Sequence, residues 1–213
     1  YLSNGTLHTM LSQAGGGVAW YRSPQIWRVN HYRFFHLPTD RSGFYTYIKD
    51  GSDVWCPTNE PCGTKPQKWQ STHGMGYTRF EAERNGLSAS ATYFVGKYEN
   101  ALIWNLKLKS DTDRKITLFP YVELGMMEFM RELQWQCYNK HQLSVYEKDG
   151  VLIYRYGVEN QPKPDETPLV YFASDAPAAG FDCVRDEFVG SYRSEEAPIG
   201  LEHAHLQNST LFG

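Results

Sequence analysis

Carboxylates are the side chains in this sequence best suited to chemistry, because catalysis at a glycosidic bond normally uses two of them that flank the bond. Asp40, Asp50 and Asp53 lie among turn residues near the start of the chain. Aspartate in a turn commonly accepts hydrogen bonds from its own backbone, which explains these three without catalysis. Glu60 lies in a proline-rich loop. Glu123 is the most interesting of the five, although an acidic residue at a helix N-terminus would account for it as well.

Other catalytic signatures are missing from the sequence, which has no nucleophile elbow, P-loop, paired-histidine zinc helix or EF-hand loop. The glycines at residues 15–17 lack the spacing of a dinucleotide motif, so we expect them to permit unusual dihedral angles or a close backbone approach. Cys56 and Cys62 flank a proline-rich loop, which leaves open a disulfide or half of a metal site. No further ligands cluster with them, so we predict free thiols and no metal.

The composition argues against two classes of partner. The 213 residues carry a formal net charge of −3, with both signs interspersed. No basic stripe indicates nucleic-acid binding, and no apolar run approaches the roughly 20 residues of a membrane-spanning helix. Aromatic residues make up 15% of the chain. They are typical of strands in a sandwich core and can also stack on sugar rings, so both interpretations stay open.

The clearest local pattern near the start of the chain predicts a β-hairpin. Residues 44–48 and 54–56 are rich in aromatic and β-branched types, which favour strands. Asp50-Gly51 between them is typical of a tight turn, and Pro57 ends the second strand because proline cannot donate to a sheet ladder. The result is a hairpin with aromatic faces.

Similar patterns recur along the rest of the chain. Asn85-Gly86 is the strongest short hairpin signal, between strands expected at residues 77–84 and 87–95. Further strands are expected at residues 7–12, 18–21, 101–109, 115–121, 142–146, 151–156, 169–174 and 181–189. Short strands at this spacing predict an all-β fold, a large antiparallel β-sandwich in one domain over residues 1–213.

Residues 122–137 do not follow this pattern of short strands and turns. Their apolar side chains recur at helical spacing, with charged residues between them. The positions concerned are Val122, Met126, Phe129, Met130, Leu133 and Cys137. We expect either one short amphipathic helix or an irregular excursion.

The stretch from Arg28 to Cys62, RVNHYRFFHLPTDRSGFYTYIKDGSDVWCPTNEPC, carries a family resemblance. Together with the opening YLSNG and the later HGMGYT at residues 73–78, it resembles the N-terminal domain of the inverting disaccharide phosphorylases of glycoside hydrolase family 94. These include cellobiose, chitobiose and cellodextrin phosphorylases, and the motifs of this chain are most similar to those of the cellodextrin enzymes. The resemblance implies a galactose-mutarotase-like supersandwich over residues 1–213. The opening without a methionine and the ending without a polar tail lead us to expect a fragment truncated at both ends, and the resemblance implies that the catalytic (α/α)₆ barrel is absent from it.

The resemblance further implies an activity for the parent protein. Such an enzyme reversibly phosphorolyses β-1,4-glucans to α-glucose 1-phosphate with inversion, with inorganic phosphate as co-substrate and no cofactor. It would be a cytoplasmic homodimer that binds β-glucan oligosaccharides, with no nucleic-acid or membrane partner. The catalytic acid is expected outside this chain, so the fragment alone should be inactive. The basic and aromatic residues 22–36 are then assigned a mainly structural role.

In that family the N-terminal domain of one subunit is expected to approach the active site of the other, through the part matching residues 122–137. We therefore expect an acceptor-binding group that offers donors for sugar hydroxyls and rings for stacking. Its members are Arg131, Gln134, Trp135, Gln136, Tyr138 and Asn139. Two rival hypotheses are a stand-alone carbohydrate-binding β-sandwich without catalysis and a pure scaffold domain.

Overall fold

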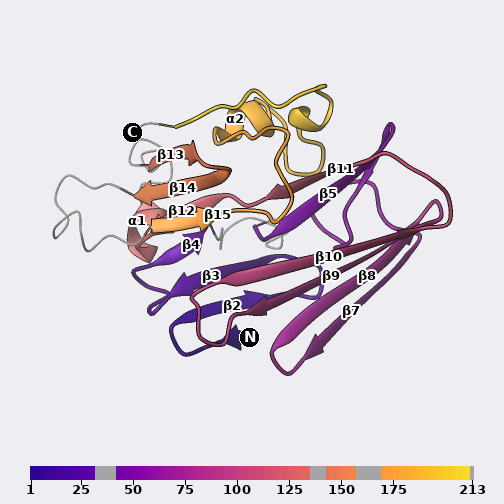
Figure 1. The fold of residues 1–213 in the computed structure, drawn as a ribbon. Coiled ribbons are helices and arrows are strands. Elements are labelled where there is room, and N and C mark those ends of the chain that lie inside the picture. Colours follow the sequence, from indigo (N-terminus) through magenta and orange to yellow (C-terminus); the bar gives the residue numbers. More distant parts are fainter. Residues whose placement is uncertain (32–41, 135–142, 157–168, 212–213) are drawn as a thin grey trace.

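The structure, a computed structural model, describes residues 1–31, 42–134, 143–156 and 169–211, and Figure 1 shows their arrangement. The described chain is almost entirely β-structure, in antiparallel sheets joined mostly by short turns. This confirms the predicted all-β sandwich. The described helical segments are short, namely α1 (Phe129–Gln134), α2 (Arg185–Phe188) and a 3₁₀ turn, η4 (Ile199–Leu201).

The N-terminal sheet has the strand order β1-β2-β3-β4-β12. Its strands are β1 (Leu2–Ser3), β2 (Leu7–Leu11), β3 (Gly17–Tyr21), β4 (Arg28–Asn30) and β12 (Leu124–Met127). The strands expected at residues 7–12 and 18–21 are confirmed as β2 and β3, which pair antiparallel across the glycine run. Gly15 has a φ of +103°, and a Cβ atom there would lie 2.5 Å from Cβ of Thr58. The glycine run thus permits both the positive φ and the close approach expected of it.

The longest strands form a second sheet of order β10-β9-β8-β7. They are β7 (Lys68–Gly74), β8 (Tyr77–Arg84), β9 (Leu87–Val95) and β10 (Leu102–Ser110). The turn between β8 and β9 has positive φ at both Asn85 (49°) and Gly86 (76°), as the Asn-Gly signal predicts. The strand β7 was not expected, because its exposed polar residues hide the alternation in a glycine-broken sequence.

Two smaller sheets complete the β-structure. One has the order β11-β5-β6, the other β13-β14-β15. Their strands are β5 (Tyr45–Asp50), β6 (Asp53–Trp55), β11 (Ile116–Tyr121), β13 (Leu143–Lys148), β14 (Val151–Tyr156) and β15 (Leu169–Phe172). The predicted aromatic hairpin is β5–β6, and it lies in the core: Tyr45, Tyr47 and Ile48 are fully buried. Burial on both faces explains its dense aromatic content.

Two local predictions need correction. Residues 181–189 do not form a strand, because the N–H groups of Phe188 and Val189 donate to the carbonyls of Val184 and Arg185 and close a helical turn. The excursion at 122–137 is a helix only from Phe129. The residues before it pair instead with β4, where Leu124 lies opposite Asn30. Sheet pairing overrides the helical spacing there.

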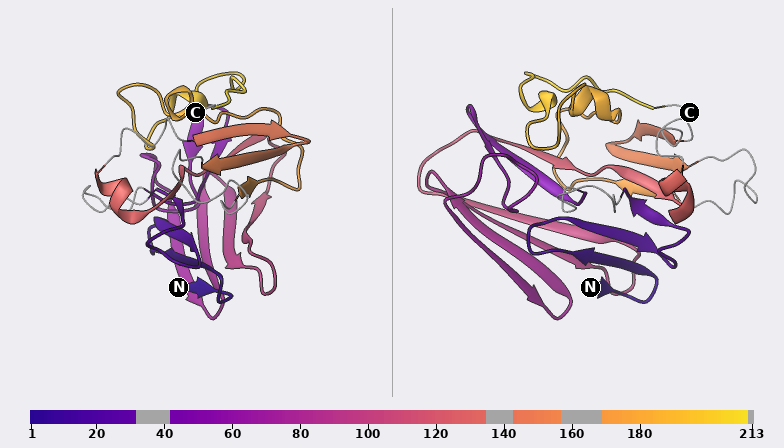
Figure 2. Two further views of the ribbon diagram at one scale, coloured as in Figure 1. Left: turned by 90° about the vertical axis from the view of Figure 1, so that its left-hand side faces the viewer. Right: turned by 180° about the vertical axis from the view of Figure 1, so that it is seen from behind.

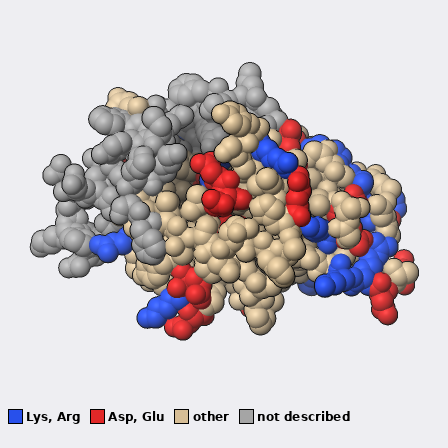
Figure 3. Space-filling view, turned by 90° about the horizontal axis from the view of Figure 1, so that it is seen from above, with Lys and Arg blue, Asp and Glu red and all other residues tan. Residues whose placement is uncertain are grey.

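Figure 2 shows how the elements are layered. The N-terminal sheet and the β7–β10 sheet lie on one side, and α2 with the C-terminal segment caps the opposite side. One core cluster joins these two sheets, with Leu11 and Ala19 from the N-terminal sheet and Phe80 and Tyr93 from β8 and β9. On the face shown in Figure 3, the described charges of both signs are interspersed around a broad uncharged area. No helix among the described residues is long and apolar enough to cross a membrane.

Candidate functional site

The helix α1 carries the described part of the predicted acceptor-binding group. Gln134 lies at its last position and is exposed, and Arg131 lies one turn earlier in the same helix. The structure therefore brings these two residues together at one end of the molecule, beside β4 and β12 (Figure 1). The other four, Trp135, Gln136, Tyr138 and Asn139, lie outside the described residues.

The helix is held on the N-terminal sheet through its first residue. The guanidinium of Arg28 lies 4.5 Å from the ring centroid of Phe129, and the N–H of Phe129 donates to the carbonyl of Gln25 at 2.7 Å. Arg28 also donates from Nε to the carbonyl of Pro24 at 2.9 Å and is only 7% exposed. A stacked, desolvated guanidinium of this kind contributes about 2 kcal/mol or more. The structural role expected for residues 22–36 is consistent with this contact.

The two described aspartates of the opening stretch are engaged in ion pairs between hairpins. Asp50 accepts from Nη1 of Arg114 at 2.6 Å. Asp53 accepts from Nε and Nη2 of Arg84 at 2.7 and 2.9 Å, a bidentate pair. A structural role is supported, but the described donors are side chains of other strands and loops and not, as the turn residues predict, the backbone of the aspartates' own turns. Such carboxylates hold hairpins together.

Of the two remaining early carboxylates, the structure describes one, Glu60. Glu60 lies 3.1 Å from Nζ of the exposed Lys65, in a loop at the surface. Asp40 lies outside the described residues. Within the described ranges, no group of three or more histidine, cysteine, aspartate or glutamate side chains could hold a metal ion.

Glu123 lies between β11 and β12, well before the first residue of α1, so its assignment to a helix N-terminus is wrong. It contacts Arg185, with Oε1 lying 3.4 Å from Nε. Nη2 of Arg185 donates to Oε1 of Glu195 at 2.9 Å. Burial lowers the pKa of Arg185, but the attraction of Glu123 and the hydrogen bond to Glu195 raise it overall. This triad ties α2 to the end of β11.

Cys56 and Cys62 are both free and buried. Burial raises the pKa of the Cys56 thiol, whereas a hydrogen bond with Cys56 lowers that of Cys62. Sγ of Cys62 donates to the carbonyl of Val54 at 3.4 Å. The predicted free thiols are confirmed for these two and for Cys183, and Cys137 lies outside the described residues. The pair lies in a core cluster with Tyr47 and Phe188.

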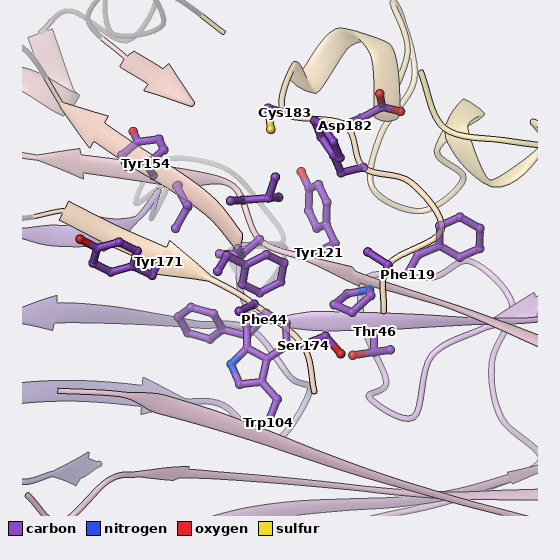
Figure 4. Close-up of a pocket in the computed structure, with 18 of the residues that line it drawn as sticks. Phe44, Thr46, Trp104, Phe119, Tyr121, Tyr154, Tyr171, Ser174, Asp182 and Cys183 are labelled. Atoms are coloured by element: carbon purple, nitrogen blue, oxygen red, sulfur yellow. The ribbon is translucent and has the colours of Figure 1, made fainter. Parts of the chain in front are cut away.

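A broad groove of about 2610 Å³ opens between the sheets. Figure 4 shows side chains from β10, β11, β14, β15 and residues 182–183 surrounding it. Its walls are largely aromatic and aliphatic, and they include Trp104, Phe119, Tyr121, Tyr171 and Phe172. The ring centroids of Trp104 and Phe172 lie 5.4 Å apart, which brings β10 and β15 together at one wall.

Sequence reasoning missed the groove and the role of Arg185. The strand alternation of β10 marks Trp104 as inward-facing, but no local pattern says that the strand lies at an edge. The residues Val184-Arg185-Asp186 match no known motif, and the partners of Arg185 come from other segments of the chain. None of these features has a signal of its own in the sequence.

The family described as "Glycosyl hydrolase 94, supersandwich domain" matches residues 1–213. An N,N'-diacetylchitobiose phosphorylase from Vibrio proteolyticus is 30% identical over 220 residues, covering 98% of this chain and 26% of the relative. A solabiose phosphorylase from Paenibacillus borealis is 26% identical over 171 residues, covering 78% of this chain and 22% of the relative.

A third relative is named for a different substrate. It is a 3-O-beta-D-glucopyranosyl-beta-D-glucuronide phosphorylase from Paenibacillus borealis, 28% identical over 217 residues, which cover 95% of this chain and 25% of the relative. The chain therefore spans about a quarter of the length of the curated relatives it matches.

Proposed function

Because this chain belongs to the glycosyl hydrolase 94 supersandwich domain family, we propose that it forms the β-sandwich domain of an inverting phosphorylase that acts on cellodextrins. The observation that carries the proposal is the family match over residues 1–213, together with relatives that all bear the name phosphorylase. The choice of cellodextrin over the substrates of those relatives rests on the motifs between Arg28 and Cys62.

In the proposed reaction an oxygen of inorganic phosphate attacks the anomeric carbon at the non-reducing end of the β-glucan. The bond from that carbon to the bridging oxygen breaks, and the bridging oxygen takes a proton from one carboxylic acid. The products are α-glucose 1-phosphate and a glucan shorter by one sugar. A single acid suffices because phosphate replaces the activated water of an inverting hydrolase. We place that acid outside residues 1–213.

The role proposed for this domain is structural, dimerising and acceptor-binding. Arg131 and Gln134 offer donors to sugar hydroxyls, and Trp135, Gln136, Tyr138 and Asn139 follow them directly in sequence. The contact between Arg28 and Phe129 supports the proposal, because it fixes the start of the helix that presents Gln134. We propose that in a cytoplasmic homodimer this end of one subunit approaches the active site of the other.

The first experiment measures phosphate release from α-glucose 1-phosphate by the full-length protein. The acceptors are glucose, cellobiose, cellotriose and N-acetylglucosamine. Phosphate release with cellobiose and cellotriose should exceed that with glucose by about tenfold or more, a difference that one additional bound sugar can supply. Activity with N-acetylglucosamine alone would contradict the substrate class, and no activity with any acceptor would contradict the enzyme class.

Two further measurements separate this proposal from its rivals. Light scattering should give a dimer for the full-length protein, and a monomer at assay concentration would argue against an acceptor site shared between subunits. Residues 1–213 produced alone should show no phosphorolysis. Oligosaccharide binding by residues 1–213 alone, with an inactive full-length protein, would instead favour a carbohydrate-binding module.

A further inference from the structure

We propose that the groove between β10, β11 and β15 is the docking site for an extended segment of the same polypeptide from outside residues 1–213, which adds to the free edge of β10. The proposal concerns how the domain is completed. It does not depend on which sugar the protein uses.

The free edge of β10 is the first observation. β10 pairs with β9, and the described residues give it no partner on its other side. The N–H of Gly96 donates to the carbonyl of Ala101 at 2.8 Å, and this pair continues the β9–β10 register. Hydrogen-bonded pairs alternate along an antiparallel ladder, so those of β10 fall at Ile103 and Asn105. The N–H and C=O groups of the residues between them point away from β9.

These outward-facing backbone groups belong to Leu102, Trp104 and Leu106, and all three residues line the groove. The second half of the strand carries Lys107 and Lys109, which lie outside the groove lining. Lysines blunt a strand edge against unwanted pairing, whereas the groove half of β10 has no such protection. Among the described residues, the edge of β10 is therefore open to pairing where the groove lies.

The walls of the groove favour polypeptide over sugar. Ligand pockets for small molecules measure roughly 300–1,000 Å³, and this groove of about 2610 Å³ is much larger. Its walls include exposed apolar side chains, namely Leu118 at 41%, Leu169 at 43% and Tyr171 at 61% exposure. Large contiguous apolar surfaces are covered in functional proteins. A strand presents an apolar side chain to one face at every second residue, which matches such walls.

Buried polar atoms along the groove give an independent observation. Among the described residues, the hydroxyl of Tyr154, Oδ2 of Asp182 and Nδ1 of His203 are buried without a hydrogen-bond partner, and all three residues line the groove. Native structures satisfy nearly all such atoms. Among the described residues, the hydrogen bonding beside the groove is therefore incomplete.

The length of the curated relatives indicates where the segment comes from. The curated relatives are about four times longer than the part that this chain matches. Leu211 also lines the groove, and its backbone pairs with that of Val145 through hydrogen bonds of 2.6 and 3.1 Å. Extended chain from the C-terminal side thus already runs along this wall. Strand addition of this kind draws its affinity from main-chain hydrogen bonds and its specificity from side-chain pockets.

The test uses the full-length protein without substrate. Hydrogen exchange should be about 100-fold slower at the N–H groups of Leu102, Trp104 and Leu106 than at the outward N–H groups of β7, the other edge of the same sheet. A photoreactive phenylalanine analogue in place of Tyr171 should cross-link to a peptide of the same chain outside residues 1–213. The same analogue in place of Tyr98, which is 82% exposed and outside the groove, should not.

Three results would overturn the proposal. Exchange as fast in β10 as in β7 would mean that the edge is open. Protection that disappears on dilution, with cross-links to a second copy, would make the groove a subunit interface. Protection that appears only with added cellodextrin would make it a sugar site. Because no step measures phosphorolysis, failure here is distinct from failure of the proposed function.

Discussion

At the scale of single residues, the functional side chains divide into those that hold the domain together and those that face outward. Arg28, Arg84 and Arg185 belong to the first kind, since each binds groups from other segments. Gln134 belongs to the second, being exposed at the end of α1. Charge type alone does not separate the two kinds, because the partners come from distant parts of the chain.

Replacement of Gln134 tests the acceptor-binding proposal directly. Gln134→Ala in the full-length protein should raise the KM for cellobiose about five- to tenfold, the effect of one lost hydrogen bond. The KM for phosphate should not change. Met130→Ala is the matched control, because Met130 is 45% exposed on the same helix and has no side-chain donor to offer. Equal effects of the two substitutions would point to a general disturbance of α1.

Buried tyrosines predict a loss of stability at alkaline pH. Burial raises the pKa of Tyr47, Tyr93 and Tyr154 above the usual value of about 10. The contribution of these tyrosines to the free energy of unfolding is therefore fully present below about pH 10. It is lost as the pH rises further, because the tyrosines then ionise in the unfolded state and stay neutral in the folded state. Each adds about 1.4 kcal/mol per pH unit to the decline.

Urea unfolding between about pH 8 and 11 measures this decline. Tyr93→Phe should reduce the slope of the free energy of unfolding against pH by the share of one tyrosine, because one fewer hydroxyl ionises on unfolding. It should also cost about 1 kcal/mol at neutral pH, because the hydroxyl of Tyr93 donates to the carbonyl of Phe44 at 3.0 Å. Tyr98→Phe is the control, since Tyr98 is largely exposed. An unchanged slope in Tyr93→Phe would show that another group governs alkaline unfolding.

At the scale of elements, tight hairpins define the sheets. The β8–β9 turn has the two positive φ angles of a turn whose twist suits the flanking strands, and the β13–β14 turn repeats this at Asp149 and Gly150. These turns set the register of long ladders, which in β8–β9 runs from Arg84 opposite Leu87 to Thr78 opposite Tyr93. The inward residues of β9 then reach the core.

Gly86→Ala tests the importance of this turn. An alanine at a φ of +76° is strained, and its Cβ would lie 3.2 Å from Nη2 of Arg114. We expect a loss of about 1–2 kcal/mol in the free energy of unfolding. Gly63→Ala is the matched control, because φ is not positive there and the nearest atom lies 3.8 Å away. Thermal unfolding compares the two, and equal midpoints would refute the assignment of strain to Gly86.

At the scale of the whole molecule, the open groove is the dominant feature. It joins the free edge of β10, the exposed side chains of β11 and β15, and buried polar atoms without described partners. A domain with these features shields its core only when another segment covers them.

Residues 1–213 produced alone should therefore self-associate and bind a dye for exposed apolar surface, whereas the full-length protein should do neither. Leu118→Lys together with Tyr171→Lys should reduce both effects, because both side chains are exposed at the groove. Tyr98→Lys should change neither. Sedimentation over a range of concentrations checks this, and a monodisperse fragment without dye binding would argue against an uncovered groove.

The sequence by itself determined most of the strands, because alternation and turn chemistry are local. The hairpins at Asp50-Gly51 and Asn85-Gly86 follow from dipeptides that suit tight turns, and both are confirmed. It also identified the family, through motifs between Arg28 and Cys62. It failed at residues 124–127, where pairing with β4 outweighed the helical spacing, and at residues 181–189, where local hydrogen bonds close a helical turn instead of a strand.

Only the tertiary structure shows which partners the acidic residues bind and where the groove lies. The residues around Glu123 in the sequence do not indicate that Arg185 lies beside it. The alternation of β10 is likewise the same whether its far edge is paired or free. Both facts depend on segments distant in the chain, and long-range contacts of this kind leave no periodic trace in a single sequence. For that reason local reasoning found the strands but not the groove.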